Sequence, residues 1–193
     1  SDAITSSGGA NTITDMTASD LTSLTVNATT AFTITNAITS ATALATVDAS
    51  GSTAAVDIDS TNSTTAMTMT GGAGGDTLAG GSGNDTISGG AGADTLTAGG
   101  GVDSIDGGAG NDTIAMAANY ATTDVIDGGD GTDTLTITGT SGATITPTAA
   151  SISNVEAIQF TAAGAGANGL ALTNLSGVAA VTIADGTNVA TTV

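Results

Sequence analysis

Residues 71–115 read GGAGGDTLA GGSGNDTIS GGAGADTLT AGGGVDSID GGAGNDTIA, which is five nine-residue units without a gap. A related unit, GGDGTDTLT, follows at residues 128–136. The shared form is Gly-Gly-x-Gly-x-Asp-x-(Leu/Ile)-x. A short fixed period predicts a repeat architecture in which each unit stacks on its neighbours and buries a continuous core.

Each unit divides into a turn and a strand. The first six positions must turn sharply, and glycine adopts the positive φ angles that such turns need. Positions seven to nine form a short strand with position eight pointing inward. The inward row holds only leucine and isoleucine, as a narrow aliphatic core requires: Leu78, Ile87, Leu96, Ile105 and Ile114.

The sixth position is always aspartate. Two consecutive units make one full turn of the repeat structure, called a rung, so each unit is half a rung. Alternate units therefore stack on one another, and their aspartates form two columns: Asp76, Asp94 and Asp112 on one side, Asp85 and Asp103 on the other. Adjacent rungs lie about 4.8 Å apart, where unpaired carboxylates repel strongly in a dry site. The chain has no Lys, Arg or His to relieve this repulsion. A hard divalent cation is the remaining solution, and carboxylate and carbonyl oxygens suit calcium better than magnesium.

The repeat is interrupted at Met116. If Met116, Ala117 and Ala118 are an insertion, the frame resumes with Asp124 at position six and Ile126 at position eight. The next unit places Asp133 at position six and Leu135 at position eight. The columns then hold four and three aspartates in five neighbouring pairs, which predicts about five calcium ions. The pair that uses Asp124 departs most from the motif, because the preceding turn lacks glycines.

Three further aspartates, Asp106, Asp127 and Asp130, fall outside the sixth position, and we expect them to be solvated or to have a secondary role.

The units resemble the glycine-rich nonapeptide of the RTX (repeats-in-toxin) family. The departures in residues 71–115 are few: Ala98 replaces a first-position glycine, and Gly100 occupies a variable position. The resemblance implies calcium ions held between the turns of alternate units. The aspartates that the resemblance implies as calcium ligands are Asp76, Asp85, Asp94, Asp103 and Asp112, and turn carbonyls are the other ligands that it implies. The predicted fold is all-β: a right-handed parallel β-roll, or β-solenoid, with Thr/Ala-rich β flanks.

The composition limits the function of the chain. Its 193 residues carry a net charge of -18, from 17 aspartates and Glu156, with no cysteine. Nucleic acid is excluded as a partner because no side chain can neutralise a phosphate, and an anionic membrane is excluded unless calcium bridges it. No run of 18 apolar residues predicts a transmembrane helix. Without His, Cys, Lys or Arg, the usual nucleophile–base pairs are missing, so we expect no enzymatic activity.

The regions that flank residues 71–136 are rich in Thr and Ala. Residues 1–20 are expected to be a polar arm, either flexible or adding a strand to a neighbouring molecule through residues 11–14. Residues 21–70 predict five short strands of a sandwich or, preferably, a solenoid. Residues 137–193 predict a C-terminal β region, in which Glu156 is expected at the surface. The segment SISNVEAIQF resembles, more weakly, bacterial surface-layer (S-layer) proteins that carry RTX repeats.

These features predict a secreted structural protein at the bacterial cell surface. It would fold on binding calcium and self-assemble into an S-layer or extracellular filament, with cell-surface polysaccharide, bridged by calcium, as a further partner. The alternatives are a calcium-stabilised module of a large RTX adhesin and the carrier region of an enzyme exported by type I secretion.

Overall fold

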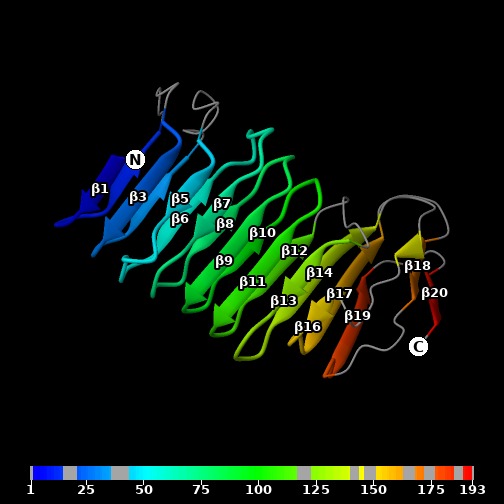
Figure 1. The fold of residues 1–193 in the computed structure, drawn as a ribbon. Coiled ribbons are helices and arrows are strands. Elements are labelled where there is room, and N and C mark those ends of the chain that lie inside the picture. Colours follow the sequence, from blue (N-terminus) through cyan, green and yellow to red (C-terminus); the bar gives the residue numbers. More distant parts are fainter. Residues whose placement is uncertain are drawn as a thin grey trace.

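The computed structural model describes residues 2–14, 21–35, 44–116, 123–139, 144–145, 151–162, 168–171, 177–184 and 189–192. Within these ranges every regular element is a β-strand. The described residues contain no helix that is long and apolar enough to cross a membrane. The strands follow one another along a single axis from the N-terminus (blue) to the C-terminus (red), so chain order is largely stacking order (Figure 1). The prediction of an all-β solenoid is confirmed.

The chain alternates between two parallel sheets. The first sheet has eight strands, in spatial order β1 (Asp2–Ser6), β3 (Ser23–Ala28), β5 (Thr46–Asp48), β7 (Thr68–Thr70), β9 (Thr86–Ala91), β11 (Ser104–Ala109), β13 (Val125–Asp127) and β16 (Ile152–Ser153). The second has nine strands, β2 (Asn11–Ile13), β4 (Phe32–Ile34), β6 (Val56–Asp59), β8 (Thr77–Ala79), β10 (Thr95–Thr97), β12 (Thr113–Met116), β14 (Thr134–Gly139), β17 (Ala157–Ala162) and β19 (Ala180–Ala184). A separate three-stranded sheet contains β15 (Thr144–Ile145), β18 (Asn168–Ala171) and β20 (Val189–Thr192).

The register confirms that one nonapeptide is half a rung. Leu78 of β8 pairs with Leu96 of β10, and Ile87 of β9 pairs with Ile105 of β11. Each residue therefore stacks on the residue two units along the chain. Odd and even units belong to different sheets, and both sheets are parallel.

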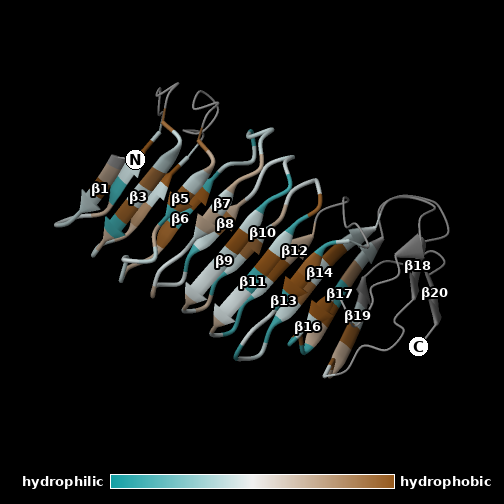
Figure 2. Cartoon of the chain, viewed as in Figure 1, coloured by the Kyte–Doolittle hydropathy of each residue, from teal (hydrophilic) through white to brown (hydrophobic). Residues whose placement is uncertain are grey.

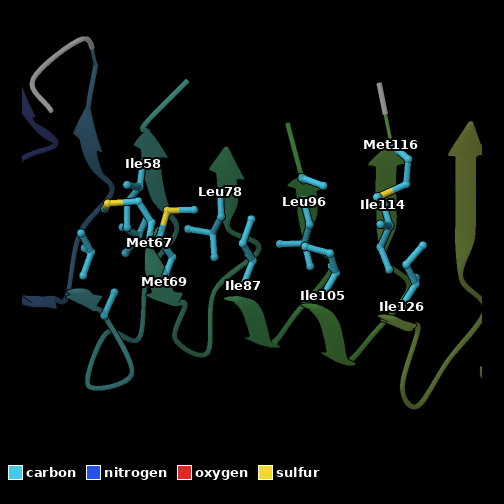
Figure 3. Close-up of a cluster of buried hydrophobic side chains, with 14 of the residues drawn as sticks. Ile58, Met67, Met69, Leu78, Ile87, Leu96, Ile105, Ile114, Met116 and Ile126 are labelled. Atoms are coloured by element: carbon cyan, nitrogen blue, oxygen red, sulfur yellow. The ribbon is translucent and has the colours of Figure 1, made fainter. Parts of the chain in front are cut away.

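The core lies between the two sheets and is narrow. The position-eight side chains are at most 1% exposed: Leu78, Ile87, Leu96, Ile105, Ile114, Ile126 and Leu135. Figure 3 shows most of these side chains pointing toward one another from the facing sheets. In Figure 2 the apolar positions appear as brown bands along the successive strands. Each half-rung of the repeat block thus contributes one leucine or isoleucine at position eight, and β12 and β14 add Met116 and Ile137 to the core.

The five strands expected between residues 21 and 70 are present as β3 to β7, and they continue the same two sheets. The solenoid alternative is therefore correct, and the sandwich alternative is wrong. Phe32, Met67 and Met69 are buried in the core.

The N-terminal segment differs from the arm that the sequence suggested. Strands β1 and β2 pair with β3 and β4 and form the first rung of the solenoid. Ile4 and Ile13 pack against the core. The polar composition concealed this rung, because each half-rung here needs only one or two inward apolar residues. Residues 15–20 lie outside the described ranges.

The interruption of the repeat lies slightly later than expected. Ile105 pairs with Ile126, which confirms the three-residue shift in frame. Met116, however, is not part of the insertion, because it belongs to β12, pairs with Ile137 and is buried. Ile114 and Met116 both face inward, as the period of two along a strand requires. The extra residues therefore follow Met116, and residues 117–122 lie outside the described ranges.

Residues 137–193, predicted to be a C-terminal β region, contain β15 to β20 in their described parts.

Candidate metal centres

The seven sixth-position aspartates occupy equivalent places, each just before a strand that begins at the next residue. All are at most 3% exposed: Asp76, Asp85, Asp94, Asp103, Asp112, Asp124 and Asp133. Such burial is unusual for aspartate unless its charge is compensated. For all of them except Asp124, whose turn lacks the repeat glycines, the placement follows from glycine turns that fold back tightly enough to direct the sixth side chain along the stack.

One column contains four aspartates joined by hydrogen bonds. The backbone N–H of Asp76 donates to Oδ1 of Asp94 at 2.6 Å. In the same way, Asp94 N–H donates to Asp112 Oδ1, and Asp112 N–H donates to Asp133 Oδ1, both at 2.8 Å. Each carboxylate therefore reaches back to the preceding rung, so neighbouring carboxylates are held in line.

The other column contains three aspartates with the same geometry. Asp85 N–H donates to Asp103 Oδ1 at 2.8 Å, and Asp103 N–H donates to Asp124 Oδ1 at 3.0 Å. Asp124 thus takes its expected place even though its turn lacks the repeat glycines. The two columns give five neighbouring pairs, which are the pairs that the sequence frame predicted.

Burial and mutual repulsion disfavour the charged carboxylates. Burial raises the pKa of Asp94 to about 6; the hydrogen bond from Asp76 N–H opposes this, and the charges of Asp76 and Asp112 add to it. Burial likewise raises the pKa of Asp103 to about 6, with the charges of Asp85 and Asp124 adding to the rise. The pKa values of Asp76, Asp85, Asp112 and Asp133 are also raised, and burial is the largest cause for each. A cation would restore the charged form.

The second carboxylate oxygens differ along the first column. Oδ2 of Asp76 accepts a hydrogen bond from Gly72 N–H at 2.6 Å. Oδ2 of Asp94, Asp112 and Asp133 is buried and has no hydrogen-bond partner among the described residues. Buried polar atoms without partners are rare in folded proteins, and one common explanation is a bound ion or water.

The first-position glycines explain where such an ion would fit. A Cβ atom on Gly89 would lie 2.5 Å from the Gly107 carbonyl oxygen and would also collide with Asp94 Oδ2. A Cβ atom on Gly107 would lie 2.6 Å from Asp112 Oδ2 and would collide with the Gly128 carbonyl oxygen. At each place a carboxylate oxygen and a carbonyl oxygen from the next rung converge beside a glycine that leaves the space open.

This donor set fits calcium. No three acidic side chains cluster closely enough to hold one ion in the described parts of the chain, so each site would combine one or two carboxylates with backbone carbonyls. Calcium accepts six to eight such oxygens in flexible geometry, whereas zinc and copper prefer nitrogen and sulfur ligands, and the chain contains no histidine or cysteine.

The aspartates outside position six lie on the outer surface. Asp106 and Asp127 are paired neighbours on β11 and β13, and Asp106 and Asp130 are exposed. Asp127 is half-buried and accepts a hydrogen bond from Asn154 Nδ2 at 2.7 Å. Their positions agree with the expectation that they are solvated or secondary.

Glu156 is the residue whose role the sequence reasoning missed. We expected a surface position, but the side chain is half-buried and its Oε2 accepts a hydrogen bond from Asp133 N–H at 2.7 Å. It therefore continues the four-aspartate column by one rung. A usable signal was present, because Glu156 stands two residues before the inward Ile158, as each aspartate stands two residues before its inward leucine or isoleucine.

The comparisons with known proteins agree with this geometry. Residues 70–105, 80–114 and 121–142 each match the family model that describes four copies of the RTX calcium-binding nonapeptide repeat. No curated protein and no solved structure matches the chain significantly. The repeat block therefore consists of RTX calcium-binding repeats arranged as a β-roll, while the similarity to surface-layer proteins stays a prediction.

Proposed function

We propose that this RTX β-roll protein is a secreted structural protein whose repeat block folds on binding calcium and which then assembles at the bacterial cell surface. The observation that carries the proposal is the pair of buried aspartate columns in a chain without any basic side chain. No group in the protein itself can neutralise these charges. A role without catalysis is part of the proposal.

Calcium links export to folding in this scheme. Without calcium, the column carboxylates repel one another, and the glycine-rich turns lose much conformational entropy when they become ordered. The repeat block then stays unfolded, which suits passage through a secretion channel. Outside the cell, calcium near the millimolar range of weak extracellular sites binds the folded block and stabilises it by linkage.

The ends of the solenoid supply surfaces for assembly. Strands β1 and β2 lie at one end of the two sheets, and β16 and β19 lie at the other. Among the described strands, none pairs with the outer edge of these four in its sheet, and such open edges invite pairing with another chain. Head-to-tail contact between the two ends would produce a filament or a lattice row unless the rotation closed a ring.

The first test separates calcium-dependent folding from constitutive folding. Circular dichroism should show a large gain in β signal when calcium is added to protein purified with chelator. The same spectrum in chelator and in calcium would contradict calcium-dependent folding.

The second test concerns assembly, measured by light scattering with calcium at high protein concentration. We expect large particles from the native chain. Strand β2 offers a matched variant, because Asn11 N–H donates to Ala31 O and Thr35 N–H donates to Ile13 O, both at 3.0 Å. Residues 11 and 13 thus bond to β4, and in a parallel ladder the backbone of Thr12 then faces the open edge.

Thr12→Pro removes that outward N–H and should reduce assembly while leaving the calcium midpoint of folding unchanged. A native chain that stays monomeric in calcium would reject self-assembly and favour an adhesin module or the carrier region of an enzyme.

A further inference from the structure

The turn between β16 and β17 differs from the repeat turns. It contains only Asn154, Val155 and Glu156, whereas six residues, 128–133, connect β13 to β14. It has no glycine, and Asn154 provides the left-handed conformation with φ of 50°. Asparagine tolerates this conformation better than most residues. The turn is therefore a shortened half-rung that no nonapeptide motif describes.

Asn154 stacks on the first-position glycine of the preceding unit. Ile126 pairs with Ile152, and Gly128 N–H donates to Ser153 O at 3.0 Å. A Cβ atom on Gly128 would collide with the Asn154 carbonyl oxygen and would lie 2.8 Å from Asp133 Oδ2. The same arrangement of a carbonyl and a carboxylate oxygen surrounds Gly107 in the repeat block.

Glu156 takes the place of the sixth-position aspartate. Its Oε2 accepts from Asp133 N–H at 2.7 Å, just as Asp133 Oδ1 accepts from Asp112 N–H at 2.8 Å. The glutamate side chain is one methylene longer than aspartate. This extra length compensates for a turn that is three residues shorter.

Asp133 provides independent support for a ligand at this place. The residue is completely buried, and its Oδ2 has no hydrogen-bond partner among the described residues. We propose that Asp133 Oδ2, the Asn154 carbonyl oxygen and the Glu156 carboxylate contribute to an additional calcium site at the C-terminal end of the column. Two of these three residues, Asn154 and Glu156, lie beyond residues 121–142, the last segment that matches the repeat family. The proposal of this site rests on the proposed calcium binding by the neighbouring repeats, and it does not rest on the proposed assembly.

Glu156→Gln separates a calcium ligand from a simple hydrogen-bonding cap. The glutamine oxygen can still accept the Asp133 N–H, but the negative charge is gone. Native mass spectrometry of the whole protein with calcium should count one ion fewer than in the native chain. Asp106→Asn carries the same charge change at an exposed position and should keep the native count. An unchanged count in Glu156→Gln would overturn the proposal, because the carboxylate would then serve only as a cap.

A second measurement does not depend on the folding of a variant. Crystals of the native chain grown with calcium should show an anomalous peak beside Asp133 Oδ2 and the Asn154 carbonyl oxygen, within reach of Glu156. Peaks between the aspartate pairs without a peak at this place would also overturn the proposal.

Discussion

Replacement of Asp94 by asparagine should have opposite effects with and without calcium. Asparagine Oδ1 can still accept the hydrogen bond from Asp76 N–H, now 2.6 Å long. Its uncharged Nδ2 would take the place of the unpartnered Oδ2. In calcium-free protein at neutral pH, the change removes a buried charge that opposes folding, so the fraction of folded repeat block should rise.

The loss in calcium can be estimated from the number of pairs that each aspartate joins. When free calcium is about 100 times the dissociation constant, one site adds about 2.7 kcal/mol to the free energy of unfolding. Asp94 pairs with both Asp76 and Asp112, so loss of both sites would cost about 5 kcal/mol. Asp76 ends the column, because its Oδ1 accepts from Val56 N–H at 2.7 Å, and Asp76→Asn should cost about half as much.

Denaturant unfolding followed by circular dichroism at one fixed calcium level measures the loss, and the β signal in calcium-free buffer measures the gain. Asp106→Asn is the control, since Asp106 is exposed and lies outside the columns. The expected order of loss in calcium is Asp94, then Asp76, then Asp106. Equal losses for the Asp94 and Asp106 variants would refute the shared-column reasoning, and equal losses for Asp94 and Asp76 would refute the pair count.

Two further predictions concern pH and the turn glycines. Folding raises the pKa values of Asp94 and Asp103 from 3.8 to about 6, so the folded state binds more protons in that window. Lowering the pH from about 6 to about 4 should therefore favour the folded repeat block in calcium-free protein, and a β signal in circular dichroism that stays constant over this range would contradict this. Gly89→Ala should weaken calcium binding in calorimetry, because its Cβ would meet Asp94 Oδ2 and the Gly107 carbonyl, whereas Gly9→Ala, with open space around its Cβ, should bind as the native chain does.

The repeat block could be predicted from sequence because a single period determines both its sheets and its columns. Once position eight was assigned to the core, position six had to lie at the end of a turn, and the eighteen-residue stacking placed Asp76 against Asp94. The structure shows this register directly. The three-residue shift was also visible, since Asp124 and Ile126 restore the pattern after it.

Features outside the period were harder to predict. Glu156 was missed because its turn is three residues shorter and contains no glycine, so the motif is absent although the stacking is the same. The N-terminal rung was missed because Ile4 and Ile13 are isolated in polar sequence. Pairing with β3 and β4 stabilises these strands, and such contacts between distant segments leave no local signal.

The N-terminal rungs should be less dependent on calcium than the repeat block. Strands β3 to β7 bury larger side chains, including Phe32 and Met69, and the buried polar residues described between 21 and 70 are serines, with no buried aspartate. Each fully buried large side chain contributes about 1.5–3 kcal/mol, without a charge to offset it. In a solenoid, stability depends on each rung and its neighbours, so these rungs can persist while the carboxylate columns keep the next ones open. Hydrogen exchange of calcium-free protein at neutral pH should show protected amides in β3 to β6 and rapid exchange in β8 to β12, with protection spreading along the stack as calcium is added. Equal protection of both regions at every calcium level would show that the solenoid folds as one unit and that the buried aspartates do not set a boundary within it.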